Sequence, residues 1–195
     1  MSDDFNRANG GLGANWTSQV NTALAISSNH VIAGSSGENE ASYYNGAWSN
    51  DQESSAVFTW GGTAYLGVTV RASGTGGSFT CYYFLTDGSS YSELGKYVSG
   101  AQTILSTSFA HPASGSVVKI RAVGTAINIY DDGVAIGGSP FTDASIASGN
   151  PGIYDYDGGA FTAHIDDWNG ADVGGGGGGS AIPRIVSQFR KRRAA

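Results

Sequence analysis

The chain has 195 residues, of which 31 are glycine, one is cysteine and only 13% are charged. The single cysteine, Cys81, excludes an intramolecular disulfide and a multi-cysteine zinc site. Many turn-forming and aromatic residues with few good helix formers predict a β-sandwich or barrel, and the length fits one domain. The sequence contains no run of about 18 apolar residues, so it predicts no membrane-spanning helix. We expect no secretion leader because the start is neither basic nor apolar.

Short runs with strand-like alternation recur about every ten residues, and turn residues such as Asn45-Gly46 and Asp87-Gly88 separate them. In chain order the first nine predicted strands are residues 16–20, 24–27, 30–33, 41–45, 53–60, 64–72, 79–86, 92–98 and 102–106. Twelve or more short strands predict an all-β, two-sheet antiparallel sandwich. Cys81 shares its alternation with Phe79, Tyr83 and Leu85, which predicts a buried thiol.

The run from Val117 to Val123 carries the clearest strand signal, because apolar and charged residues alternate along it. A further run follows at 127–130, and the dipeptide Asp132-Gly133 then supplies the positive φ angles of a tight turn. We therefore predict that 127–130 folds back onto 134–136 as an antiparallel hairpin.

Charge divides the chain into unequal parts. All sixteen acidic residues and five basic ones precede the glycine run that starts at Gly174, which gives the body a charge of about −11. The other five basic residues follow the run. We predict a domain at 1–173, a polyglycine linker at 174–179 and a basic amphipathic tail at 180–195.

The tail has the pattern of a short amphipathic helix with a basic C-terminal end, which suits the helix dipole. Its apolar stripe is Ile182, Ile185, Val186 and Phe189, and its basic cluster is Arg190, Lys191, Arg192 and Arg193. So short a helix is marginal in water, which leaves three readings: a solvated tail, a docking peptide that orders against a partner, or adhesion to a membrane or to nucleic acid. The acidic body argues against nucleic acid as that partner.

Several segments resemble the concanavalin A-like jelly-roll superfamily, which includes laminin-G-like modules and laminarinase-type glycoside hydrolases. They are Asp3-Asp4-Phe5-Asn6-Arg7, Gly11-Leu12-Gly13-Ala14-Asn15-Trp16, Lys119-Ile120-Arg121-Ala122-Val123-Gly124 and Asp132-Gly133-Val134. The resemblance implies two curved antiparallel sheets with adjacent first and last strands. Residues 4–6 would then lie beside residues 167–169.

The resemblance also bears on catalysis. Laminarinase-type members carry a Glu-x-Asp-x-x-Glu strand, which this sequence lacks. Glu38 and Glu40 are predicted in a loop, and Asp155 and Asp157 in a turn, so neither pair forms the two facing carboxylates that a retaining glycosidase needs. We predict a protein without enzymatic activity.

Two segments have the composition of a sugar site, which pairs flat aromatic rings with short polar groups. We interpret both as loops, and the alternative for each is packing or protein contact. The candidate glycan-binding residues are Tyr43, Tyr44, Asn45 and Trp48 in the first, and Tyr154, Asp155 and Tyr156 in the second.

No cofactor is certain from the sequence, but calcium prefers several carboxylate oxygens, and two groups of aspartates could supply them. Asp155 and Asp157 alternate in one predicted turn. Asp4, Asp166 and Asp167 would meet if the terminal strands pair, where members of the superfamily often carry a structural calcium. The alternative is solvated turns.

We infer from these features a virion structural protein, a head decoration or fibre protein of a tailed bacteriophage, assembled in the host cytoplasm. Its tail would attach it to capsid or tail proteins in an oligomeric assembly, and its domain would bind cell-surface glycans weakly. The alternative is a free carbohydrate-binding module or a glycoside hydrolase of laminarinase-like fold.

Overall fold

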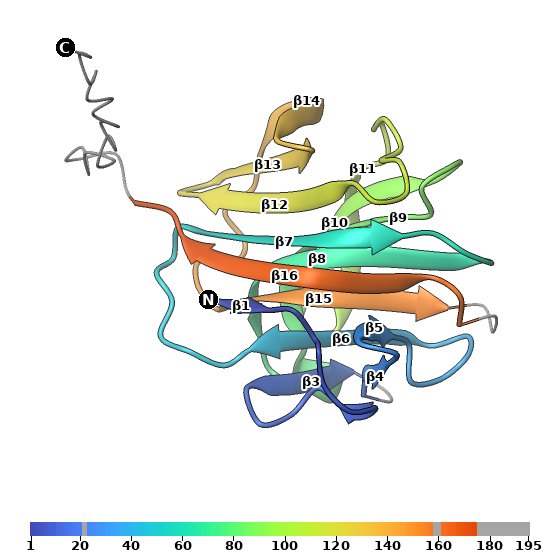
Figure 1. Cartoon of the computed structure of the whole chain (residues 1–195). Coiled ribbons are helices and arrows are strands. Elements are labelled where there is room, and N and C mark those ends of the chain that lie inside the picture. The colour runs from blue at the N-terminus through green and yellow to red at the C-terminus, as the bar shows by residue number, and fades with distance from the viewer. Residues whose placement is uncertain (21–22, 158–160, 175–195) are drawn as a thin grey trace, which may run out of the picture.

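The computed structural model describes residues 1–20, 23–157 and 161–174. Two antiparallel sheets pack face to face (Figure 1), which confirms the predicted all-β sandwich. A short 3₁₀ turn, η1 (Gly76–Ser78), interrupts the strands. Within the described ranges no helix is long and apolar enough to cross a bilayer.

One sheet has nine strands among the described residues. Eight follow one another in space: β14 (Val134–Thr142), β13 (Ala126–Asp131), β12 (Val117–Val123), β7 (Gln52–Thr59), β16 (His164–Asp172), β5 (His30–Ile32), β4 (Ala25–Ser27) and β2 (Gly10–Gly11). The ninth, β1 (Ser2–Asp3), pairs with β16.

The other sheet has seven strands among the described residues. Their spatial order is β11 (Ala101–Ser106), β10 (Ser92–Val98), β9 (Thr80–Thr86), β8 (Ala64–Ser73), β15 (Asn150–Asp157), β6 (Asn39–Tyr44) and β3 (Trp16–Val20). Non-consecutive neighbours such as β8 and β15 bring distant parts of the chain onto one surface.

The predicted hairpin at Asp132-Gly133 is confirmed. Asp131 pairs with Val134, so the connection has two residues, and both have positive φ angles of 46° and 80°. This backbone twist matches that of the flanking strands, which is why Asp-Gly favours tight hairpins.

The main core lies between the two sheets, where every second residue of each strand points inward. Val118, Ile120 and Ala122 of β12 are fully buried there, as the alternation predicted. From the seven-stranded sheet, Val68 and Phe84 enter the same core.

The first and last described strands are adjacent, as the resemblance implied. Ser2 pairs with Asn169 and Asp3 with Trp168. The carboxylate of Asp3 accepts a hydrogen bond from Arg7 at 2.6 Å and one from the Trp16 indole at 2.8 Å. These contacts fix the N-terminal segment against the sandwich.

Two sequence interpretations are wrong. Residues 154–157, predicted as a turn, belong to β15, which lies between β8 and β6 in the sheet, and Glu40, predicted in a loop, lies in β6. Acidic residues are depleted in strands, so the acid-rich composition hid a two-residue alternation.

A second apolar cluster lies on the outer face of the seven-stranded sheet. It contains the buried residues Ala41, Ala72, Phe79, Cys81, Tyr83, Leu85 and Tyr154, with further tyrosines packed around them. Cys81 is buried as predicted, and burial raises the pKa of its thiol well above the usual range. The predicted linker beyond Gly174 and the tail at 180–195 lie outside the described residues.

Candidate functional site

The outer face of the seven-stranded sheet is hollowed into a cavity of about 210 Å³, which we call the tyrosine basin. Five of its nine lining residues are tyrosines. The lining residues are Asn39, Tyr65, Leu85, Tyr91, Glu93, Tyr97, Gln102, Tyr154 and Tyr156. They come from strands β6, β8, β9, β10, β11 and β15 and from the residue before β10.

Strand periodicity explains why these residues gather. In β15, Tyr154 and Tyr156 point outward while Ile153 points into the core. In β10, Leu94 enters the core while Glu93 and Tyr97 face the basin. Tyr65, Tyr91, Tyr97 and Tyr156 remain partly exposed, so their rings are available to a ligand.

The floor of the basin is built on a close approach of Tyr83 to the backbone of β10. A Cβ atom on Gly95 would lie 2.2 Å from the Tyr83 hydroxyl oxygen, so only glycine leaves room for this ring. Tyr83 in turn stacks on Tyr154, with ring centroids 5.8 Å apart.

A buried carboxylate, that of Glu93, connects Tyr83 at the floor of the basin with Tyr91 in its wall. Glu93, only 3% exposed, accepts hydrogen bonds from the hydroxyls of Tyr83 and Tyr91. Gln102 donates to Tyr83 at 2.7 Å and to Glu93 at 3.3 Å. The bond to Glu93 and partial burial raise the pKa of Tyr91 to about 12. Burial and the bond to Glu93 also raise the pKa of Tyr83 well above its usual range, so both tyrosines stay protonated donors.

The remaining walls are also ordered by aromatic contacts. Tyr65 lies 5.7 Å from both Tyr91 and Tyr156, measured between ring centroids. The Tyr154 hydroxyl donates to the side-chain oxygen of Asn39. The basin therefore presents preformed ring faces beside hydroxyl, amide and carboxylate groups, the chemical pattern of a sugar site.

The first predicted glycan segment is a strand and the loop that follows it. Tyr43 lies on the outer face, packed against the same cluster as the basin but outside its lining. Tyr44 points inward and stacks on Trp168 at 5.0 Å, and Trp48 packs beside it. Asn45 binds Thr17 and the carbonyl of Ala14. The structure thus does not bring these four side chains onto one surface.

The second predicted segment is split by the alternation of β15. Tyr154 and Tyr156 line the basin, whereas Asp155 is 1% exposed and faces the interior. Sequence reasoning missed Tyr65, Tyr91, Glu93, Tyr97, Gln102 and Asn39. The spacing of Tyr91, Glu93 and Tyr97 along a predicted strand was the signal that could have found part of this set.

Inside the sandwich, Asp155 faces two other buried acids, Glu40 and Asp157. Glu40 accepts hydrogen bonds from the Gly34 N–H at 2.6 Å and the Ser35 hydroxyl at 2.7 Å. Neither oxygen of Asp155 accepts a well-formed hydrogen bond. Burial raises the pKa of Asp155 well above its usual range, and the charges of Asp157 and Glu40 raise it further. The contact with the Ala33 backbone lowers this pKa, but only in part.

The aspartates predicted near the termini are spread over two places. Asp4 and Asp167 line a surface hollow, while Asp166 lies close to the stacked imidazoles of His30 and His164. Within residues 1–20, 23–157 and 161–174, no three His, Cys, Asp or Glu side chains are arranged to hold a metal ion. Calcium therefore stays a prediction.

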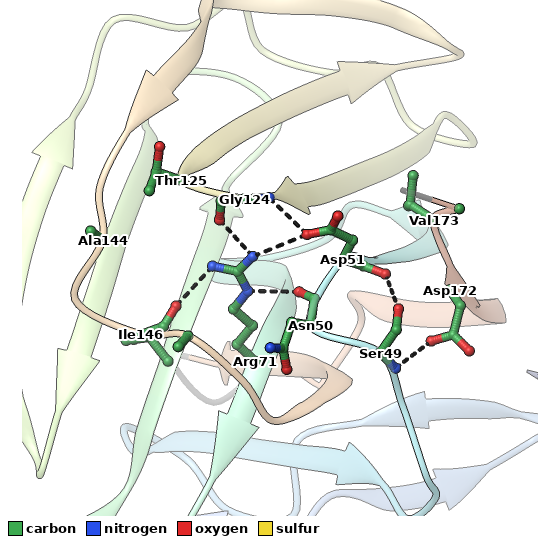
Figure 2. A pocket seen from close by; sticks show the side chains of 12 residues that line it. Ser49, Asn50, Asp51, Arg71, Gly124, Thr125, Ala144, Ile146, Asp172 and Val173 are labelled. Carbon is green, nitrogen blue, oxygen red and sulfur yellow. Dashed lines mark hydrogen bonds and ion pairs between the residues drawn. The ribbon is translucent and has the colours of Figure 1, made fainter. Parts of the chain in front are cut away.

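A larger hollow of about 640 Å³ lies at one end of the sandwich, where the described chain ends (Figure 2). Its centre is Arg71, whose side chain is 3% exposed. The guanidinium donates to the carbonyls of Asn50 at 2.9 Å, Ile146 at 2.8 Å and Gly124 at 2.7 Å. Asp51 lies 3.7 Å away as a counter-charge.

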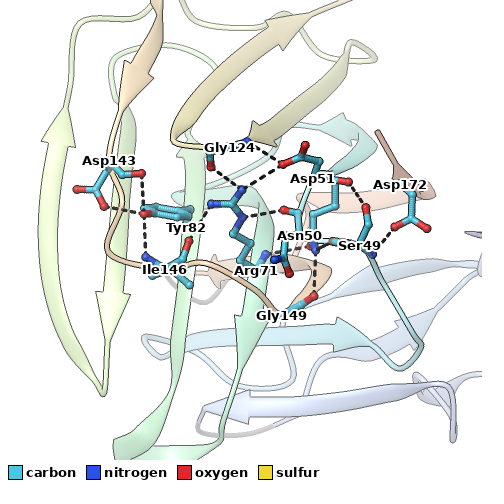
Figure 3. Close-up of polar contacts among 11 residues, drawn as sticks. Ser49, Asn50, Asp51, Arg71, Tyr82, Gly124, Asp143, Ile146, Gly149 and Asp172 are labelled. Carbon is cyan, nitrogen blue, oxygen red and sulfur yellow. Dashed lines mark hydrogen bonds and ion pairs between the residues drawn. The ribbon is translucent and has the colours of Figure 1, made fainter. Parts of the chain in front are cut away.

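Figure 3 shows that this network joins several connections between strands. The Gln52 side chain accepts from the Arg71 N–H at 3.0 Å and donates to the carbonyls of Ser49 and Gly149. The Tyr82 hydroxyl donates to Asp143 and accepts from the Ile146 N–H. We call this cavity the Arg71 hollow. The Arg71 guanidinium donates to backbone carbonyls and no described lining residue is aromatic, so we assign the hollow a structural role.

No protein-family model and no curated protein sequence matches this chain. Among solved structures, the carbohydrate-binding module CBM66 from Bacillus subtilis is similar with a TM-score of 0.67 and 17% identity, over 83% of this chain and 98% of its own. The Crh5 transglycosylase in its apo form has a TM-score of 0.58 and 9% identity, over 89% and 84%.

The exoplasmic/lumenal domain of VIP36, in a form bound to calcium and mannose, has a TM-score of 0.57 and 12% identity, over 82% of this chain and 83% of its own. At these identities the likeness concerns the fold. The fold is the β-sandwich seen in carbohydrate-binding modules and lectins, as the resemblance implied.

Proposed function

We propose that this chain is a carbohydrate-binding module that holds a sugar in the tyrosine basin without cleaving it. The observation that carries the proposal is the set of partly exposed tyrosine rings fixed around Glu93, Gln102 and Asn39. Ring faces can stack on the apolar face of a sugar while the polar groups bind its hydroxyls.

Binding is favoured over hydrolysis by the chemistry of the basin. Glycosidases use two carboxylates that flank the bond they cut. Among the described lining residues, Glu93 is the one carboxylate, and its oxygens already accept hydrogen bonds from Tyr83 and Tyr91. The fold is shared with a carbohydrate-binding module and with the mannose-bound domain of VIP36, but also with a transglycosylase, so the preference for binding rests on the chemistry of the basin.

The proposal is tested by a glycan array followed by calorimetric titration of the glycans that bind. Replacing Tyr91 or Tyr156 by Ala removes a ring from the wall and should weaken binding about tenfold. The control is Tyr130→Ala, because Tyr130 is also partly buried but lies on the nine-stranded sheet. Equal losses in all three variants, or no bound glycan, would contradict the proposal.

Attachment to a virion through the tail is the more specific part of the proposal. It rests on the sequence of residues 180–195 alone, and the fold comparisons reported above support the domain, not the particle. The partners would be capsid or tail proteins that bind Ile182, Ile185, Val186 and Phe189 with the basic cluster after them. Co-purification of the full chain with particles tests it.

A further inference from the structure

We infer that the tyrosine basin selects sugars by charge: it takes neutral and amino sugars and discriminates against sugars that carry carboxylate, sulfate or phosphate groups. The inference rests on the proposed sugar binding and adds the chemical class of the ligand. It depends on one residue, Glu93, and on the finding that no basic side chain lies among the described residues that line the basin.

Glu93 is the one charged group among the described residues that line the basin. The groups that bind its oxygens are the hydroxyls of Tyr83 and Tyr91 and the amide of Gln102, all neutral. Neutral donors can bind a carboxylate, but they supply no positive charge that would cancel its own. Among the described lining residues, the Glu93 carboxylate therefore has no cationic partner.

No basic side chain of the described chain is free to neutralise this charge. Each of the five is in an ion pair with an acid other than Glu93: Arg7 with Asp3, Arg71 with Asp51, Lys96 with Asp143, and both Lys119 and Arg121 with Glu53. Lys96 is on the same strand as Glu93, yet its ammonium lies 2.6 Å from Asp143.

The expected size of the effect follows from Coulomb's law. A charged group on a sugar about 6 Å from Glu93, in a partly solvated basin, changes affinity about three- to tenfold. The change weakens binding for an anion and strengthens it for an ammonium. At about 1 M salt the Debye length falls to about 3 Å, and most of the difference should disappear.

The first experiment is a glycan array of matched sets, in each of which one neutral backbone also occurs in sulfated, uronic acid and de-N-acetylated forms. We expect neutral and amino forms to bind and the acidic forms to bind three- to tenfold more weakly. Acidic forms that bind as well as their neutral partners would overturn the charge inference and leave sugar binding intact. An array without any bound glycan would overturn the proposed function itself.

The second experiment assigns the effect to Glu93. Calorimetric titration of the best neutral and acidic pair should give a ratio of affinities near one for Glu93→Gln. The matched control, Asp167→Asn, removes the same charge from an exposed position on the nine-stranded sheet and should keep the wild-type ratio. If Glu93→Gln keeps that ratio, or if both variants lose it, Glu93 is not the determinant.

Salt dependence of the wild-type protein tests the inference without any substitution, should Glu93→Gln fold poorly. The neutral-to-acidic ratio should fall toward one between about 0.05 M and about 1 M salt. A ratio that does not change with salt would mean that shape, not charge, excludes the acidic sugars.

Discussion

The Arg71 hollow and the tyrosine basin are both built around a buried charge, but the partners of the two charges differ. Arg71 binds backbone carbonyls from three separate connections, so its charge organises the path of the chain. Glu93 binds the side chains of Tyr83, Tyr91 and Gln102, which are themselves the floor and walls of a surface. The larger hollow thus holds three connections between strands together, whereas the smaller one presents aromatic rings and polar groups to a ligand.

Substitution of Arg71 should have the largest effect and should act on stability rather than on binding. Arg71→Ala leaves three carbonyls without donors, which we expect to cost about 3 kcal/mol or more of unfolding free energy. Arg71→Lys should recover little, because an ammonium cannot reproduce the planar fork of the guanidinium. Equilibrium urea unfolding measures both changes.

Two controls complete this test: the substitution of a second arginine, and the sugar affinity of the Arg71→Ala variant. Arg121 forms a partly exposed ion pair with Glu53 on the nine-stranded sheet, so Arg121→Ala should change stability by less than about 1 kcal/mol. The folded fraction of Arg71→Ala should bind sugar with wild-type affinity. A selective loss of affinity there would reverse the roles assigned to the two hollows.

Substitution of Gly95 tests how strictly the basin floor is packed. A Cβ at this position falls 2.2 Å from the Tyr83 hydroxyl oxygen, so Gly95→Ala must displace the ring. We expect a loss of about 2 kcal/mol in stability and weaker sugar binding. Gly77→Ala, where a Cβ meets nothing within 4 Å, is the control and should be near neutral. Unchanged binding in Gly95→Ala would show that Tyr83 does not shape the site.

The inner face of β15 should give the protein a pH-dependent stability. The folded-state pKa of Asp155 is raised above its unfolded value of 3.8. The folded state therefore holds a proton that the unfolded state releases first, so stability is highest below the unfolded pKa and falls as pH rises toward the folded pKa. Between these two pKa values, each pH unit lowers the free energy of unfolding by about 1.4 kcal/mol.

Asp155→Asn should remove this slope and make the protein more stable than the wild type near neutral pH. Urea unfolding from about pH 4 to about pH 8 measures it. Asp167→Asn, at an exposed position, should keep the wild-type slope. A rise in melting temperature on adding calcium that Asp155→Asn abolishes would show that a cation, rather than a proton, compensates these carboxylates.

The sequence predicted the strands where apolar and polar residues alternate cleanly. The predicted bounds of β3, β10 and β12 agree with the structure, and the Asp132-Gly133 turn set the register of its hairpin. The prediction failed at β15, where the alternating partners are tyrosine and aspartate. Both faces of that strand are largely buried, so hydrophobicity did not distinguish inside from outside.

The basin could not be predicted as a unit, because its residues span Asn39 to Tyr156. Those from Tyr65 to Gln102 lie on consecutive strands, but Asn39, Tyr154 and Tyr156 join them only because β15 inserts between β8 and β6, a strand order that local patterns do not encode. Tyr154 and Tyr156 were found because aromatic residues cluster there in the sequence. Glu93 was missed because a single acid does not indicate a role by itself, and its spacing of two residues from Tyr91 and four from Tyr97 was the one local signal that could have revealed it.

Removal of residues 175–195 should have the smallest effect of all on the folded body. The last described strand, β16, ends at Asp172, and Val173 donates its N–H to the carbonyl of Asp51 at 2.8 Å, so every described contact is kept in the shortened chain. We expect an unchanged melting temperature and an unchanged sugar affinity, while attachment to particles is lost. A clear drop in melting temperature would show that the tail packs on its own domain, and the docking reading of Ile182, Ile185, Val186 and Phe189 would then fail.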